Sequence, residues 1–178
     1  MTPPPYTPDE ARSRETFLAL MWAFSYPGRM YTLPSEDAFA LIGDALLDLE
    51  TSFYTPDPDL NRALLRTGAR ALLPESAAYH FYLALTPQML NDVKRASIGT
   101  MQYPDEAATL VIGCGLGRGE VYELAGPGVN GQLTMQAAGL PADFWALRAN
   151  RYPLGWDVLL VEGGRVIGLP RSTTVRRG

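Results

Sequence analysis

The chain has 178 residues, 47% of them hydrophobic, and this length favours one substantial core in a single domain. A formal net charge of -4 argues against nucleic-acid binding, because proteins that neutralise phosphates usually carry a basic face. The single cysteine, Cys114, and the single histidine, His80, exclude an internal disulfide and a clustered zinc site, so no metal is expected.

The N-terminus predicts a short tail before the folded domain. Residues 1–8 contain four prolines and are too stiff and too poor in hydrogen bonds for a regular element, so we expect a disordered Pro-rich tail. A single α/β domain is expected over residues 9–178. The sequence shows neither a signal peptide nor an apolar run of membrane-spanning length, which indicates a cytoplasmic protein without membrane contact.

The N-terminal half alternates predicted helices with short strands. Residues 9–25 predict a helix whose apolar positions are Phe17, Leu20, Met21 and Phe24. Residues 34–50 predict an amphipathic helix with Ser35 as its N-cap. Shorter helices are expected at residues 58–72 and 86–96, and strands at residues 29–33, 51–55 and 77–85.

A glycine-rich stretch, VIGCGLGRGEVYEL at residues 111–124, has some features of a phosphate-binding loop. Its glycines occupy every second position from Gly113 to Gly119, which fits neither the G-x-G-x-x-G pattern nor the P-loop pattern. The residues after it alternate between polar and apolar, as in a strand. We therefore predict a β-hairpin with the glycines in its loop.

The C-terminal half is richer in predicted strands. Strands are expected at residues 108–115, 120–126 and 131–139, followed by a helix at residues 140–150. Two apolar runs then meet at Gly163-Gly164, a strong hairpin signal. If Glu162 faces Arg165 across this turn, the pairs are Leu160 with Ile167, Val158 with Leu169 and Trp156 with Arg171.

This register makes both faces of the hairpin apolar, because Leu159, Val161 and Val166 lie on the side opposite to the first pairs. A sheet that is buried on both faces needs helices on both. The sequence therefore predicts a three-layer α/β/α fold with a mixed β-sheet.

The most polar cluster at the end of a buried strand is LPRSTT, residues 169–174. Arg171 offers a planar fork of donors, and the hydroxyls of Ser172, Thr173 and Thr174 would complete a site for phosphate, phosphonate or carboxylate. The alternative is a simple strand exit, in which Arg171 packs on Trp156 as a cation–π pair and the threonines close a turn.

Asp157 is a further ligand candidate, as a general base or as an anchor for a ribose hydroxyl. A carboxylate at the start of a strand also commonly accepts hydrogen bonds from backbone or arginine donors. The predicted register places Asp157 and Arg171 on opposite faces, so a simple pair between them requires irregular strand ends, and the partner of Asp157 stays unassigned.

The other reactive residue types form no catalytic set. His80, beside three aromatic residues, is expected to be a half-buried strand residue. We expect Cys114 to fill space at a strand end, Lys94 to be a solvated charge, and Asp105-Glu106 to form a turn or cap. The sequence therefore assigns no catalytic residue.

Six motifs follow one another along the chain: TFLALMWAFSYPG (16–28), IGT (98–100), YPDEAATLVI (103–112), LAGPGV (124–129), YPLGWDVLLV (152–161) and LPRSTTV (169–175). This ordered series resembles the PhnH family, the H subunit of the bacterial carbon–phosphorus lyase system. No single motif is diagnostic, but the ordered set spans most of the chain. The family pattern falls on Pro27, Gly28, Gly99, Pro104, Thr109, Gly126, Gly128, Pro153, Gly155, Asp157, Pro170, Arg171, Thr173 and Thr174.

Three positions depart from the family pattern. Leu18 replaces the usual arginine of the first helix and cannot supply an anion contact there. Phe24 stands where methionine is usual, and Ser172 stands where threonine is common, which keeps the hydroxyl.

The resemblance implies a subunit of alpha-D-ribose 1-methylphosphonate 5-triphosphate synthase, inactive alone. That assembly transfers the ribose triphosphate moiety of ATP to an alkylphosphonate and releases adenine. The resemblance also implies a homodimer, partner subunits G, I and J, and a fold like the large domain of PLP-dependent transferases. Because a PLP enzyme needs a Schiff-base lysine and Lys94 is the only lysine, we expect no PLP in this chain, and ATP only as a substrate of the complex.

Two alternatives stay open from the sequence. In the first, the chain is a purely structural assembly subunit that touches no substrate. In the second, it is a free-standing PLP-type enzyme that uses Lys94.

Overall fold

The computed structural model describes residues 6–178, so residues 1–5 of the expected tail lie outside the described part of the chain. Helix α1 (Pro8–Ser25) starts within the region expected to be tail. Thr7 caps this helix: its hydroxyl accepts a hydrogen bond from the Glu10 N–H, and the Glu10 carboxylate accepts one from the Thr7 N–H. This capping box draws Thr7 and Pro8 into the helix start.

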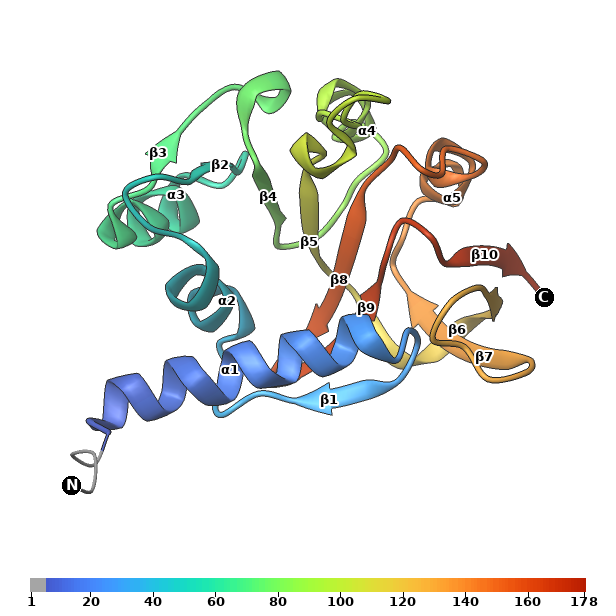
Figure 1. Ribbon diagram of the computed structural model, residues 1–178, viewed down its shortest axis with the longest axis horizontal. Coiled ribbons are helices and arrows are strands. Elements are labelled where there is room, and N and C mark those ends of the chain that lie inside the picture. Colours follow the sequence, from blue (N-terminus) through green and yellow to red (C-terminus); the bar gives the residue numbers. More distant parts are fainter. Residues whose placement is uncertain (1–5) are drawn as a thin grey trace.

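A seven-stranded mixed sheet forms the centre of the molecule, in the order β1-β9-β8-β5-β4-β2-β3 (Figure 1). Strands β8, β5, β4, β2 and β3 run parallel, whereas β9 and β1 add antiparallel neighbours at one edge. Its strands are β1 (Met30–Thr32), β2 (Ser52–Tyr54), β3 (Arg70–Ala71), β4 (Tyr79–Tyr82), β5 (Thr109–Gly113), β8 (Asp157–Glu162) and β9 (Arg165–Leu169).

The β8–β9 hairpin has the predicted register. Val158 lies opposite Leu169, Leu160 opposite Ile167, and Glu162 opposite Arg165. The fourth expected pair, Trp156 with Arg171, lies beyond the ends of both strands.

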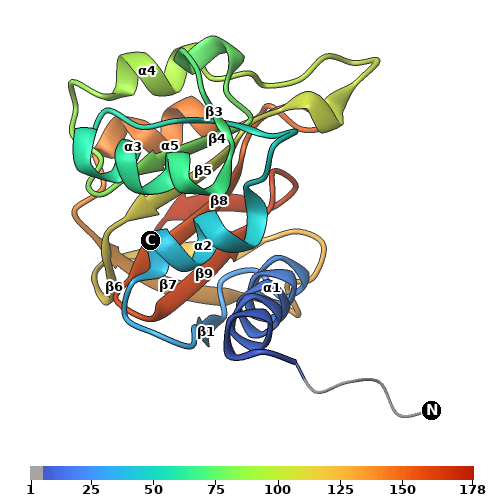
Figure 2. The ribbon, with the colours of Figure 1, turned by 90° about the vertical axis from the view of Figure 1, so that its left-hand side faces the viewer.

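Helices cover both faces of the large sheet. On one face, α1, α2 (Ala38–Leu46) and α3 (Pro58–Leu64) pack on a core that includes Val111, Leu159 and Val166. On the other, α4 (Leu90–Arg95) and α5 (Ala142–Arg148) share a core with Leu160 and Ile167. Figure 2 shows α1 beside β1 and β9, apart from α4. The mixed α/β architecture with helices on two sides agrees with the sequence.

The hairpin predicted over residues 111–124 is wrong. Strand β6 (Gly115–Ala125) follows β5 directly, but it pairs with β7 (Leu133–Ala138) and β10 (Thr174–Arg177) in a separate three-stranded antiparallel sheet. Strand β5 cannot accept it, because β4 and β8 already occupy both edges of β5. Gly115, Gly117 and Gly119 lie within β6, whose pairing with β7 shifts register between Leu116 and Glu120, as at a β-bulge.

Helices α2, α3 and α4 are shorter than their sequence patterns, whereas α1 is not. Asp37, not Ser35, caps α2, since its carboxylate accepts a hydrogen bond from the Ala40 N–H at 3.1 Å. The residues expected to continue α3 form a 3-10 turn, η1 (Leu65–Thr67), and then strand β3. Gly68 ends the turn with a φ of 88°, a left-handed conformation that favours glycine. Two more 3-10 turns are η2 (Pro74–Ser76) and η3 (Pro104–Glu106).

Helix α1 packs through small residues rather than through its large apolar ones. Its buried side chains are Thr16, Ala19, Leu20 and Ala23, so Leu20 and the half-buried Phe24 are the predicted apolar positions that reach the core. Phe17 and Met21 are exposed. The cause is a close approach to β9, where a Cβ on Gly168 would lie 2.6 Å from the backbone carbonyl of Ala23.

Candidate functional site

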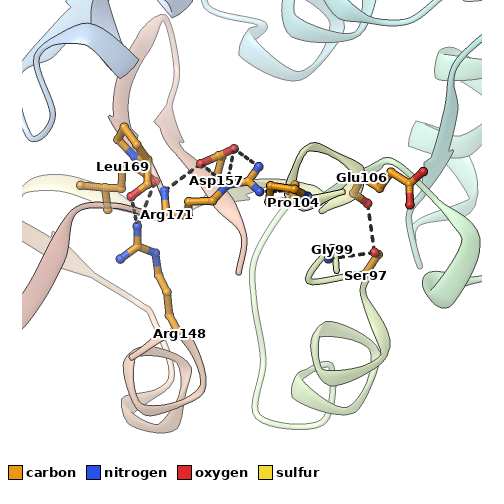
Figure 3. A network of polar contacts seen from close by, with 9 residues as sticks. Ser97, Gly99, Pro104, Glu106, Arg148, Asp157, Leu169 and Arg171 are labelled. Atoms are coloured by element: carbon orange, nitrogen blue, oxygen red, sulfur yellow. Dashed lines mark hydrogen bonds and ion pairs between the residues drawn. The ribbon is translucent and has the colours of Figure 1, made fainter. Parts of the chain in front are cut away.

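Arg171 and Asp157 form an ion pair where β5 and β8 begin and β9 ends (Figure 3). The Arg171 Nη2 lies 2.6 Å from Asp157 Oδ2, and the Arg171 backbone N–H donates to Oδ1 at 2.7 Å. The predicted register allowed this pair only with irregular strand ends, and the regular pairing does stop before Arg171. Strand β9 ends at Leu169, and a turn closed by the Thr173 N–H and the Pro170 carbonyl redirects the chain.

The cation–π pair considered for Arg171 belongs to another arginine. The Arg151 guanidinium lies 5.1 Å from the ring centre of Trp156. Arg171 instead donates to the Pro104 carbonyl as well as to Asp157. Every nitrogen of the Arg171 side chain therefore has an acceptor within the chain.

Several positions of the family pattern lie near these ends of β5, β8 and β9. The Gly155 N–H donates to the Ile98 carbonyl, and Gly99 packs against Pro104. Thr109 lies opposite Asp157 in the β5–β8 pairing.

The Gly126–Gly128 turn links the end of α1 to the 170–174 segment, because Gly128 packs against Ser25 and Pro27, and Gly126 against Ser172. Pro153 precedes this region after a cis peptide bond with Tyr152.

Gly126 shows why this turn needs glycine. Its φ is 131°, and a Cβ there would lie 2.7 Å from the Ser172 carbonyl oxygen. A larger residue would push the turn away from the segment that carries Arg171.

Arg148, at the end of α5, is a residue that sequence analysis missed. Its side chain is buried and donates to the carbonyls of Thr173 at 2.7 Å, Leu169 at 3.1 Å, and Pro170. Burial lowers the pKa of Arg148 to about 10, an effect that the charge of Asp157 partly opposes. The sequence feature that could have identified Arg148 is its position one helical turn after Phe144, which places an arginine on the apolar side of the predicted helix.

A pocket of about 280 Å³ lies beside Arg148. It is lined by the end of α5, by residues 149–152 and by residues 171–175, so four of the five predicted ligand residues contribute and Asp157 does not. Arg148, Arg151 and Arg171 bring three guanidinium groups to a lining that holds no Asp, Glu or His. This arrangement can hold an anion, but no carboxylate or imidazole in the lining could act as a general acid or base.

The other candidate residues lie away from the pocket. His80 is fully buried, not half-buried; its Nδ1 lies 3.2 Å from the Tyr82 hydroxyl, and burial lowers its pKa to about 4. Burial raises the pKa of the Cys114 thiol to about 12, so this thiol is protonated at neutral pH. Lys94 is exposed on α4.

Residues 6–178 offer neither a metal-ion site nor a membrane-spanning helix. These residues contain no group of three or more His, Cys, Asp or Glu side chains that could hold a metal ion. None of the helices in the same range is both long and apolar enough to cross a membrane.

The fold and the pocket together define an α/β domain with a cationic pocket between the end of α5 and the segment that follows β9. Residues 5–176 match the family described as "Bacterial phosphonate metabolism protein (PhnH)". The chain therefore belongs to the PhnH family, as its ordered motifs indicated.

Two curated relatives match nearly the whole chain. The chain is 33% identical over 171 residues to the "Putative C-P lyase subunit protein HtxG" of Stutzerimonas stutzeri, covering 92% of this chain and 86% of the relative. It is 28% identical over 190 residues to the "Alpha-D-ribose 1-methylphosphonate 5-triphosphate synthase subunit PhnH" of Rhizobium meliloti (strain 1021), covering 93% of this chain and 90% of the relative.

Proposed function

We propose that this chain is a subunit of alpha-D-ribose 1-methylphosphonate 5-triphosphate synthase in a carbon–phosphorus lyase complex. The observation that carries the proposal is the near full-length match to two relatives, one named as a C-P lyase subunit and the other as a subunit of the synthase. The assembly would transfer the ribose triphosphate moiety of ATP to an alkylphosphonate and release adenine.

The proposed reaction sets three tasks at the anomeric carbon. The triphosphate must be held, the phosphonate oxygen must be aimed, and the leaving adenine must be protonated. The guanidinium and hydroxyl groups of the pocket suit the first two tasks. No Asp, Glu or His lines the pocket, so we assign the proton donor to another subunit and expect no activity from this chain alone.

An exposed aromatic stripe on α1 supports contact with partner chains. Phe17 and Trp22 are 52% and 45% exposed, Met21 and Tyr26 are exposed as well, and the rings of Trp22 and Tyr26 stack on each other. Contiguous exposed apolar residues commonly mark interaction sites. We propose that the stripe contacts a second copy of the chain or the G, I or J subunit in the cytoplasm. The likeness to the large domain of PLP-dependent transferases, without bound PLP, also stays a prediction.

A second candidate function is a purely structural subunit without substrate contact. The observation in its favour is that Asp157 and the Pro104 carbonyl already accept hydrogen bonds from every side-chain nitrogen of Arg171. Arg171 then holds the fold rather than a ligand.

Co-expression with the G, I and J subunits from one source, followed by size-exclusion light scattering and an adenine-release assay, tests both functions. We expect one high-mass species that loses this chain when Phe17 and Trp22 are replaced by serine. Met101→Ser, at an exposed position elsewhere, is the matched control and should leave the species intact. Elution of this chain apart from the others would contradict both functions. If substitutions block the pocket beside Arg148 and the assembly still releases adenine at the full rate, the result would favour the purely structural function.

A further inference from the structure

Arg148 is a buried cation without an ion pair. Its residue is 8% exposed, and it forms none of the ion pairs found within residues 6–178. Three carbonyl oxygens accept from its terminal nitrogens, but carbonyl dipoles do not neutralise a charge. Asp157, the carboxylate whose charge acts on it, is already paired with Arg171. Buried charges are normally paired with an opposite charge, so a bound anion would stabilise the Arg148 guanidinium.

Unpartnered polar atoms gather at the same place. Within residues 6–178, the buried side-chain atoms without a hydrogen-bond partner are Arg148 Nε, Thr173 Oγ1, Trp145 Nε1 and His80 Nε2. All but the last belong to residues that line the 280 Å³ pocket. Three groups that can donate hydrogen bonds therefore lack acceptors around one cavity.

The position of the pocket beside the end of α5 does not oppose anion binding. The free carbonyl groups at the C-terminal end of a helix normally repel anions. Here the Arg151 Nε donates to the Leu147 carbonyl, and the Ala149 N–H donates to the Trp145 carbonyl. Arg151 also forms none of the ion pairs found within residues 6–178, so it adds a second uncompensated positive charge to the lining.

We propose that this pocket binds a tetrahedral phosphorus oxyanion through Arg148, Arg151, Thr173 and Trp145, and that Arg171 is a positioning residue. Arg171 and Asp157 fix the 170–174 segment, which presents the Thr173 hydroxyl, while the two other arginines supply the charge. The inference rests on the proposed function for its ligand class. Either an alkylphosphonate or a phosphate of the ATP triphosphate carries the required oxyanion chemistry.

The test measures binding of methylphosphonate and of tripolyphosphate to the full chain by calorimetry, at fixed low salt. Thr173→Val removes the unpartnered hydroxyl with little change of shape, and Arg151→Gln removes a half-buried charge. We expect each to weaken binding about tenfold or more, because hydrogen bonds to charged groups and charge pairs contribute at that level. Thr16→Val, at a buried threonine of α1 whose hydroxyl donates to the Arg12 carbonyl, and Arg62→Gln, at an exposed ion pair, are the controls and should bind like the wild type.

The two ligands separate the two sources of the oxyanion. Binding of methylphosphonate alone would assign the pocket to the phosphonate, and binding of tripolyphosphate alone to the nucleotide. Absence of binding by both ligands, or equal binding by the Thr173 and Arg151 variants and their controls, would overturn the inference.

Adenine release by the co-expressed assembly separates this inference from the proposed function. If the assembly needs this chain but the pocket variants leave its KM values unchanged, the subunit function stands and the oxyanion site fails. If the chain binds the oxyanion through the pocket but never joins the assembly, the site stands and the subunit function fails.

Discussion

Arg148 and Arg171 hold the 169–174 segment from two sides. Arg171 ties it to Asp157 and Pro104, and Arg148 donates to three of its backbone carbonyls. A segment without regular structure must find other partners for its backbone groups, and guanidinium groups with several donors suit this role. At the scale of single residues, the two arginines therefore fix the geometry of the pocket.

Asp157→Asn should lower the free energy of unfolding by about 2 kcal/mol. The substitution keeps an oxygen for the Arg171 N–H but removes the charge from a pair whose side chains are 18% and 25% exposed. Urea denaturation followed by circular dichroism measures the change. Asp59→Asn removes an exposed ion pair with Arg62 and should change the free energy by less than about 0.5 kcal/mol. Equal effects of both substitutions would contradict this role for Asp157.

At the scale of elements, the contact between α1 and β9 depends on small residues on both sides. Ala23 is fully buried, and the Gly28 N–H donates to the Gly168 carbonyl at 3.2 Å. The close approach brings the helix backbone against the strand backbone. It also turns the aromatic residues of α1 outward, which creates the exposed stripe.

Gly168→Ala should destabilise the protein by about 1–3 kcal/mol, because the new Cβ would lie 2.6 Å from backbone atoms of Ala23 and force the helix away. Thermal unfolding measures the loss. Gly115→Ala, also in a strand, is the control, since its Cβ would meet the exposed end of the Arg118 side chain. A neutral result at Gly168 would show that α1 can shift freely on β9.

At the scale of the whole molecule, the two cores enclose a single titratable histidine. His80 lies in β4 at the centre of the parallel strands, and burial lowers its pKa to about 4 from an ordinary value near 6.5. The folded state therefore holds His80 neutral at a pH where the unfolded chain protonates it. Below the unfolded pKa, proton uptake favours the unfolded state.

The free energy of unfolding should fall as the pH drops from about 6.5 to about 4, by about 3 kcal/mol from His80. Above pH 6.5 this contribution to the pH dependence vanishes. Urea unfolding at a series of pH values measures the slope, and His80→Gln should flatten it, because His80 is the only histidine. An unchanged slope in that variant would contradict the low pKa.

The sequence by itself determined the α/β class, the β8–β9 register and the family. Apolar periodicity and turn residues are local properties, and the two-residue Gly163-Gly164 turn fixes which residues face each other. The ordered motifs carried the family in the same way, without any knowledge of contacts.

The tertiary structure decided the separation of β5 from β6, the outward face of α1 and the composition of the pocket. Each depends on partners distant in sequence. Strands β4 and β8 pair with both edges of β5, and the missing side chain of Gly168 lets α1 approach β9. The end of α5 places Arg148 against the 169–174 segment. Arg171 was found from its motif, but its pairing with Asp157 required the turn after Leu169. Such contacts follow from how whole elements pack, which a pattern of neighbouring residues does not contain.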